Sequence, residues 1–325
     1  MSDTKYTYVF GPVHSGRLGI SLGLDVLGRR ICSFNCPYCE VGVTDVLTVE
    51  RAPYVPANVI IGELDRFVKE GPDFDVVTLG GLGEPTLNVQ FGDILSQAKA
   101  LVKDRKTAVL TNSAHLDDAD VRRELCLADM VLPSLDSLVE DEFKRVNRPH
   151  PSCSLDSIRQ GLLDFRSMYS GTMCLEILLL DGINDTTENL DRLEDFLHHL
   201  RPDRVDVVTM TRPGTSSKIK PASAESLQRF RERLCGVGTK ATSTAKKRLS
   251  SLDKKTPLGQ EAAQDMIISS LRRRPQTAID LAKAMSMDVT MIEQELAILV
   301  ERGRVREKRK GDCIFFILAD TMIDL

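Results

Sequence analysis

The sequence predicts an α/β protein in which a partial barrel of six parallel strands is followed by a small winged helix-turn-helix domain. From Phe74 to Met210, short apolar runs alternate with longer amphipathic ones, a pattern typical of βα units around a parallel sheet. Beyond residue 259 the pattern changes to three helices and a hairpin. The chain has 325 residues, which is more than one hydrophobic core usually serves.

The apolar runs are the expected strands, because each is rich in Val, Leu or Ile and is bounded by turn residues. They are Leu18–Leu24, Asp75–Gly80, Thr107–Thr111, Met130–Ser134, Met173–Leu180 and Val205–Met210. The expected helices between them are Ile60–Lys69, Phe91–Lys103, Asp118–Leu127, Leu155–Tyr169 and Thr187–Leu200, with Ser154 and Asp185 as candidate N-caps. Right-handed crossovers would then place a ligand site at the carboxyl ends of the strands.

The predicted domains are the barrel at residues 1–236, a basic linker at 237–259 and the winged helix-turn-helix at 260–325. The linker is rich in Ser and Thr and should be exposed; its charges are Lys240, Lys246, Lys247, Arg248, Lys254 and Lys255, against Asp253. The last domain is expected to contain helices Gln260–Arg273, Thr277–Met285 and Val289–Glu301 and strands Arg304–Lys308 and Cys313–Leu318. Thr277 and Asp288 are its candidate caps, and Gly303 ends the third helix.

The composition is that of an ordinary globular chain and excludes an integral membrane protein. The apolar share of 42%, the charged share of 28% and the formal net charge of −4 are ordinary for a globular chain, and no apolar run is long enough to cross a bilayer. Without a secretory signal the chain is expected to be cytoplasmic, with reduced cysteines. Five of the eight cysteines lie far apart and are expected to be structural: Cys126, Cys153, Cys174, Cys235 and Cys313.

The other three cysteines, Cys32, Cys36 and Cys39, have the spacing C-x3-C-x2-C. Thiolates so placed can hold three irons of a [4Fe-4S] cluster and leave the fourth iron without a protein ligand. A zinc site is the alternative, but structural zinc needs four ligands, and no His or fourth Cys lies nearby. The spacing therefore favours an iron-sulfur cluster.

A glycine-rich segment with Gly81, Gly83 and Glu84 follows the second predicted strand. Glycines allow the backbone to approach a ligand closely. The alternative is a generic turn between strand and helix, and the segment is not the dinucleotide fingerprint G-x-G-x-x-G. Its position one βα unit after the cysteines favours a shared site.

These two motifs resemble those of the radical SAM superfamily, whose members cleave S-adenosylmethionine (SAM). The resemblance implies that Cys32, Cys36 and Cys39 bind a [4Fe-4S] cluster whose open iron chelates the amino and carboxylate groups of SAM. It also implies that Tyr38 lies near the adenine, and that the backbone from Gly81 to Glu84 binds the SAM amino group. Both cofactors are therefore expected.

Polar residues at the later strand ends complete the expected site: Asn112, Ser134, Asp136, Glu176 and Arg212. In related enzymes such positions bind the ribose and carboxylate of SAM or the substrate, and we assign Asn112, Ser134 and Asp136 to SAM. Glu176 lies in an apolar strand and needs a partner. An ion pair with Arg212 and a site for a substrate carboxylate are the two alternatives.

Three further segments narrow the resemblance to a prokaryotic family grouped with the wyosine-forming tRNA enzymes. They are Phe10–Gly23, the Gly-Glu-Pro-Thr run at Glu84 and Asp181–Asp185. His14 and Gly16 depart from that family's opening motif. The wyosine enzymes use a second cluster held by N-terminal cysteines, and no cysteine precedes Cys32, so wyosine formation is not expected.

The expected activity is reductive cleavage of SAM to methionine and a 5'-deoxyadenosyl radical, which abstracts hydrogen from an RNA nucleoside or a protein residue. A ferredoxin or flavodoxin would supply the electron. The alternatives are an iron-sulfur sensor that controls transcription through the winged helix, and an activating enzyme that installs a glycyl radical. Hydrogen-abstraction chemistry is favoured over sulfur insertion.

The charges of the last domain predict how it meets a partner. Its third helix carries Asp288, Glu293, Glu295 and Glu301, which repel phosphate. The basic residues of the wing and of the segment before it are expected to track an RNA backbone together with the linker; they are Arg272, Arg273, Arg274, Arg304, Arg306, Lys308, Arg309 and Lys310. A module used only for protein contact is the alternative.

Overall fold

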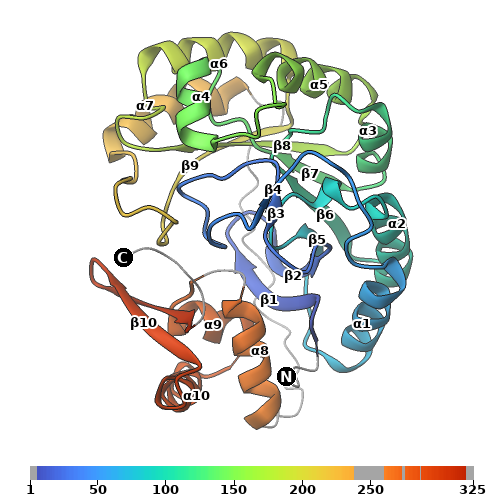
Figure 1. Ribbon diagram of the computed structural model, residues 1–325, viewed down its shortest axis with the longest axis vertical. Coiled ribbons are helices and arrows are strands. Elements are labelled where there is room, and N and C mark those ends of the chain that lie inside the picture. The colour runs from blue at the N-terminus through green and yellow to red at the C-terminus, as the bar shows by residue number, and fades with distance from the viewer. Residues whose placement is uncertain (1–5, 238–259, 273–274, 286, 320–325) are drawn as a thin grey trace.

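The computed structural model describes residues 6–237, 260–272, 275–285 and 287–319 (Figure 1). In these residues one seven-stranded sheet has the order β1-β2-β5-β6-β7-β8-β9. Strand β1 (Val9–Ser15) runs antiparallel to β2, and the strands from β2 to β9 are parallel. The expected partial barrel is confirmed, with β1 as an edge strand that the sequence did not predict. The basic residues of the linker lie outside the described residues.

The six parallel strands lie close to their predicted positions. They are β2 (Gly19–Asp25), β5 (Val76–Gly80), β6 (Lys106–Thr111), β7 (Met130–Pro133), β8 (Thr172–Leu179) and β9 (Arg204–Thr209). All five residues of β5 are buried, as expected of a strand covered on both faces. Two short strands, β3 (Ile31–Cys32) and β4 (Val46–Leu47), pair with each other in the segment that carries the cysteines.

The barrel helices bury their apolar faces against this sheet. They are α1 (Ala57–Glu70), α2 (Phe91–Val102), α3 (Ala119–Leu125), α4 (Glu140–Asn147), α5 (Leu155–Met168), α6 (Thr187–Leu200) and α7 (Ala224–Leu234). Ser154 caps α5, as predicted. Thr186, and not Asp185, caps α6, because the hydroxyl of Thr186 accepts from the amide of Asn189. None of the described helices is long and apolar enough to cross a bilayer.

Residues 260–319 form what we call the C-terminal unit, which has a hydrophobic core of its own around Ile267, Leu281 and Leu296. Its elements are α8 (Gln260–Leu271), α9 (Ala278–Met285), α10 (Val289–Glu301), β10 (Val305–Lys310) and β11 (Cys313–Leu318). Asp288 caps α10. Lys310 pairs with Cys313 across a two-residue turn whose Gly311 has a φ of 58°, a conformation that suits glycine.

The C-terminal unit contacts both edges of the barrel sheet. Helices α8 and α9 lie beside β1 (Figure 1), and the hydroxyl of Ser269 donates to the carbonyl oxygen of Val9 at 3.4 Å. At the other edge, the hairpin of β10 and β11 reaches the loop after β9, where Lys310 Nζ donates to the carbonyl oxygen of Arg212 at 2.9 Å. The unit therefore spans the open side of the partial barrel.

Candidate functional site

The three predicted cluster cysteines lie in the connection between β2 and α1, which we call the cluster loop (residues 26–56). Cys32 ends β3, and the amide of Cys39 donates to the carbonyl of Cys36 at 3.1 Å. Burial raises the pKa of the Cys32 thiol to about 12 and also raises the pKa of Cys36 and Cys39. Thiolates at these positions therefore need a cation beside them, which bound iron would supply.

Two side-chain amides donate toward sulfur in this loop. Asn112 Nδ2 lies 3.4 Å from Cys32 Sγ, and Asn147 Nδ2 lies 3.7 Å from Cys36 Sγ. Hydrogen bonds of this kind orient cluster ligands and tune cluster potentials. Among the described residues, no three Cys, His, Asp or Glu side chains are grouped as ligands of a single ion. A [4Fe-4S] cluster fits three separated thiols better than a lone metal ion does, because each thiolate binds a different iron.

Tyr38 is held by Asp136, which follows β7. The Tyr38 hydroxyl donates to Asp136 Oδ2 at 2.5 Å, Asn147 Nδ2 donates to the same oxygen at 2.7 Å, and the amide of Leu178 donates to Oδ1 at 2.9 Å. Burial raises the pKa of both Asp136 and Tyr38. Asp136 thus ties the cluster loop to the barrel, while its predicted contact with the SAM ribose stays a prediction. Asn147 was not predicted, because nothing local in the sequence marks it.

The glycine-rich segment after β5 lies against the start of the cluster loop. The amide of Glu84 donates to the carbonyl oxygen of Ile31 at 3.1 Å. A Cβ atom added at Gly83 would lie 1.8 Å from that oxygen. Gly81 has a φ of 108°, a conformation that favours glycine. The structure therefore brings the predicted SAM-binding backbone to the residue that precedes Cys32.

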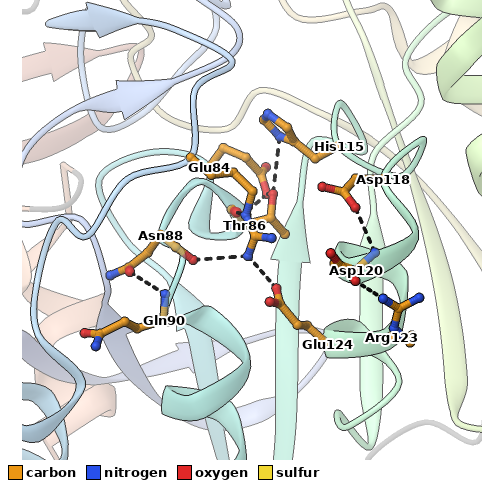
Figure 2. Close-up of polar contacts among 10 residues, drawn as sticks. Glu84, Thr86, Asn88, Gln90, His115, Asp118, Asp120, Arg123 and Glu124 are labelled. Atoms are coloured by element: carbon orange, nitrogen blue, oxygen red, sulfur yellow. Dashed lines mark hydrogen bonds and ion pairs between the residues drawn. The ribbon is translucent and has the colours of Figure 1, made fainter.

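The Glu84 carboxylate joins the loop after β5 to the end of β6. It is 2% exposed and accepts hydrogen bonds from the hydroxyls of Thr86 at 2.7 Å and Thr111 at 2.8 Å, and from the amide of Asn112 at 2.7 Å. Thr86 in turn lies 3.4 Å from Nδ1 of His115 (Figure 2). Glu84 therefore fixes Asn112 beside Cys32. No local pattern predicts that Thr86 and Thr111 are its partners.

Gly83→Ala should disrupt this contact, because the new methyl group would collide with backbone and not with a movable side chain. We expect the free energy of unfolding to fall by roughly 2 kcal/mol or more, with loss of bound iron. The matched control is Gly62→Ala in α1, where nothing lies within 4 Å of the added Cβ; there we expect a gain of up to about 1 kcal/mol. Urea unfolding and iron analysis check both variants, and equal behaviour would contradict the close approach.

Glu176 and Arg212 do not form an ion pair with each other, which was one of the two alternatives for Glu176. Glu176 pairs with Arg17, from the turn between β1 and β2. Arg212 Nη1 lies 3.6 Å from Glu40 Oε2, and Nη2 lies 3.4 Å from Asp280 Oδ2 in α9. The two residues lie at different levels of the barrel. Glu176 lies within β8, and Arg17 reaches it from the N-terminal end of the barrel. Arg212 follows the carboxyl end of β9.

Two of the predicted polar residues keep groups that a ligand could use. Arg212 is 18% exposed at its side chain, and its Nε has no hydrogen-bond partner among the described residues. Ser134 is half-buried and bridges to Glu176 through its backbone. The side chains of Asn112, Asp136 and Glu84, by contrast, are engaged within the protein.

The scattered cysteines Cys153, Cys174 and Cys235 do not come together. Cys174 is buried near the start of β8, and Cys235 Sγ donates to the carbonyl of Val205 at 3.4 Å. Cys153 Sγ lies 4.0 Å from the carbonyl oxygen of Ser33 in the cluster loop, and the three cysteines form no group of metal ligands among the described residues. Burial raises the pKa of the Cys153 thiol to about 11.

Comparison with known proteins assigns this chain to a family. Residues 28–196, slightly more than half of the chain, match the model of the radical SAM superfamily. A UPF0026 protein of Helicobacter pylori (strain J99) is 30% identical over 322 residues, which cover 97% of this chain and 99% of that protein. A protein of Brachyspira hyodysenteriae named GTPase Obg is 34% identical over 310 residues, 94% of this chain, but the chain spans only 44% of that relative.

Two more distant similarities agree with the superfamily. The dual-specificity RNA methyltransferase RlmN of Psychrobacter arcticus is 22% identical over 219 residues, 61% of this chain and 53% of that protein. The crystal structure of Streptococcus suis SuiB bound to its precursor peptide SuiA shares the fold, with a TM-score of 0.50, 20% identity and coverage of 65% of this chain and 44% of that one. Because the superfamily model matches more than half of the chain, the chain is an enzyme that uses a [4Fe-4S] cluster and SAM, and it belongs to the radical SAM superfamily.

Proposed function

We propose that this enzyme abstracts a hydrogen atom from a nucleoside in RNA, with Cys32, Cys36 and Cys39 as the cluster ligands and the C-terminal unit as the surface that holds the RNA. When bound, the cluster and SAM supply a 5'-deoxyadenosyl radical as the abstracting group. The observation that carries the RNA part of this proposal is the contact between the β10–β11 hairpin and the mouth of the barrel.

This contact lies close to the cluster loop. Lys310 Nζ reaches the carbonyl oxygen of Arg212, and the Arg212 guanidinium lies 3.6 Å from Glu40, the residue after Cys39. Asp280 of α9 meets the same guanidinium. A macromolecule bound along the hairpin would therefore lie beside the carboxyl ends of the strands, where the predicted SAM site is.

The hairpin carries the charge that RNA requires. Arg306, Lys308 and Lys310 share one face of β10, because successive side chains of a strand alternate. Arg304, Arg306 and Arg309 are exposed, and Lys308 and Lys310 are half-buried. Lys and Arg side chains that neutralise phosphates supply most of the affinity of non-specific nucleic-acid binding. The name of the relative RlmN, an RNA methyltransferase, supports the same substrate class.

Helix α10 does not offer a competing phosphate surface. Glu293 and Glu301 are exposed on it, and Glu295 accepts a hydrogen bond from Gln264. Carboxylates on the helix that would enter a major groove disfavour DNA binding. The charge distribution therefore favours RNA contact through the hairpin over the transcriptional sensor.

The barrel interior would protect a radical from water. Val76, Ala108, Leu132 and Cys174 are buried together inside it, and Leu18 from the β1–β2 turn packs against them. This apolar cluster lies toward the N-terminal end of the strands, and Glu176, two residues beyond Cys174 in β8, pairs with Arg17. Exclusion of water prevents side reactions of reactive intermediates.

The double variant Arg304→Glu/Arg309→Glu should weaken RNA binding. We expect the Kd for a labelled tRNA to rise about tenfold, and the slope of log K against log salt to fall by about two, one for each lost phosphate contact. The control is Lys103→Glu/Lys106→Glu, two exposed lysines near the N-terminal end of β6. Fluorescence anisotropy at several salt concentrations checks both. Unchanged tRNA affinity in the hairpin variant would contradict RNA contact and favour a protein substrate.

A further inference from the structure

We propose that a recess on the outer side of the cluster loop is the docking surface for an acidic one-electron carrier protein that reduces the cluster. This inference rests on the proposed function, because it takes Cys32, Cys36 and Cys39 as the cluster ligands. The recess has a volume of about 640 Å³. It is lined by Asn35 and Leu47 of the cluster loop and by Glu140, Lys144, Arg148 and His150.

The layer of residues 147–150 lies beside both Cys36 and this recess: Asn147 contacts Cys36 Sγ, and Arg148, Pro149 and His150 line the recess. The amide of Asn35 donates to the carbonyls of Asn147 and Arg148, both at 3.1 Å, and the amide of His150 donates to the carbonyl of Ser33 at 2.8 Å. On the inner side of the layer, Cys36 Sγ donates to the carbonyl of Asn147 at 3.4 Å. The covering segment is thus bonded to the cluster loop on one side and faces the recess on the other.

Two other sides of the cluster loop face other parts of the site. The glycine-rich segment and Asn112 lie against Cys32, where SAM is predicted to bind. The Glu40 side faces Arg212 and the C-terminal unit. Electron transfer slows steeply with distance, so a carrier needs a face where little protein covers the cluster. The recess provides such a face without obstructing SAM or substrate.

The charges around the recess suit an acidic partner. Arg148 is exposed, and its guanidinium forms no ion pair among the described residues. Lys144 pairs with Glu140 at 3.1 Å, but both side chains are more than half exposed, so this pair is weak. Leu47, 39% exposed, adds an apolar contact. The chain as a whole has a net charge of −4, so a local basic rim is needed to steer an acidic carrier to this face.

The test measures the rate at which reduced flavodoxin bleaches the visible absorbance of the reconstituted cluster, in wild type and in Lys144→Glu/Arg148→Glu. Neither the substrate nor SAM is needed for this readout. We expect flavodoxin to reduce the variant at least about tenfold more slowly at low salt, with a smaller difference at high salt. Reduction by dithionite, a small reductant with no docking surface, should stay within about twofold of wild type.

The matched control is Lys69→Glu on α1. Lys69 is 68% exposed and pairs with an acid four residues earlier, as Lys144 does, but it lies outside the recess. Wild-type reduction of the double variant by flavodoxin would overturn the proposal, and so would an equal slowing with dithionite, which would mean a damaged cluster loop. A wild-type enzyme that is reduced but forms no 5'-deoxyadenosine would count against the proposed function alone.

Discussion

Cys36→Ala is expected to remove bound iron almost completely, from about four irons per chain to near zero. The variant would leave two thiolates in a buried loop, and Cys36 Sγ is hydrogen-bonded to the backbone carbonyl and the side-chain amide of Asn147, which are poor iron ligands. Loss of the visible charge-transfer absorbance should accompany the loss of iron. Anaerobic reconstitution followed by iron and sulfide analysis measures both.

Cys313→Ala serves as the control, because Cys313 is exposed at the start of β11 in the C-terminal unit. It should bind as much iron as wild type. Full iron in Cys36→Ala would mean that another thiol completes the ligand set. Cys153 would then be the first candidate, since its sulfur lies 4.0 Å from the carbonyl oxygen of Ser33.

Asp136→Ala is expected to have the largest effect on stability among the site residues. It would leave the Tyr38 hydroxyl, the Asn147 amide and the Leu178 amide without their acceptor. A buried donor without a partner costs roughly 1–3 kcal/mol, so we expect the free energy of unfolding of the apoprotein to fall by about 3 kcal/mol or more. Iron retention should fall as well, because Tyr38 lies between two cluster cysteines.

Tyr38→Phe isolates the contribution of the Tyr38 hydrogen bond to this loss of stability. It removes a single donor and should cost about 1 kcal/mol, with most of the iron retained. Urea unfolding of the apoprotein and equilibrium dialysis with labelled SAM distinguish the two roles of Asp136. Unchanged stability of Asp136→Ala with a clear loss of SAM affinity would contradict the structural role and favour the ribose contact predicted from the sequence.

The parallel strands were predictable because strands buried on both faces are continuous apolar runs, as Val76–Gly80 is. Strand β1 was missed because it contains Gly11 and Pro12, residues that usually interrupt strands. Helix α4 was missed because its eight residues include only Phe143 and Val146 as large apolar side chains. A short charged helix gives little periodic signal.

In the site, too, residues that form local motifs could be predicted, and partners that are distant in the sequence could not. The cysteines and the glycine-rich segment are motifs with fixed local spacing, so the sequence displays them. Asn147 lies 111 residues from Cys36, and Arg17 meets Glu176 across most of the barrel. Such partners follow from the closure of the sheet and from packing between distant elements, which no local pattern encodes. The pairing of Arg212 with Glu40 and Asp280 likewise depends on where the C-terminal unit packs.

The most direct test of SAM cleavage by this protein is the formation of 5'-deoxyadenosine by the anaerobically reconstituted wild-type enzyme with dithionite and SAM. We expect 5'-deoxyadenosine and methionine in equal amounts, and neither product without reductant or in Cys36→Ala. A wild-type protein that carries a full, reducible cluster and forms no 5'-deoxyadenosine would contradict SAM cleavage, and would favour an iron-sulfur sensor that acts through the C-terminal unit.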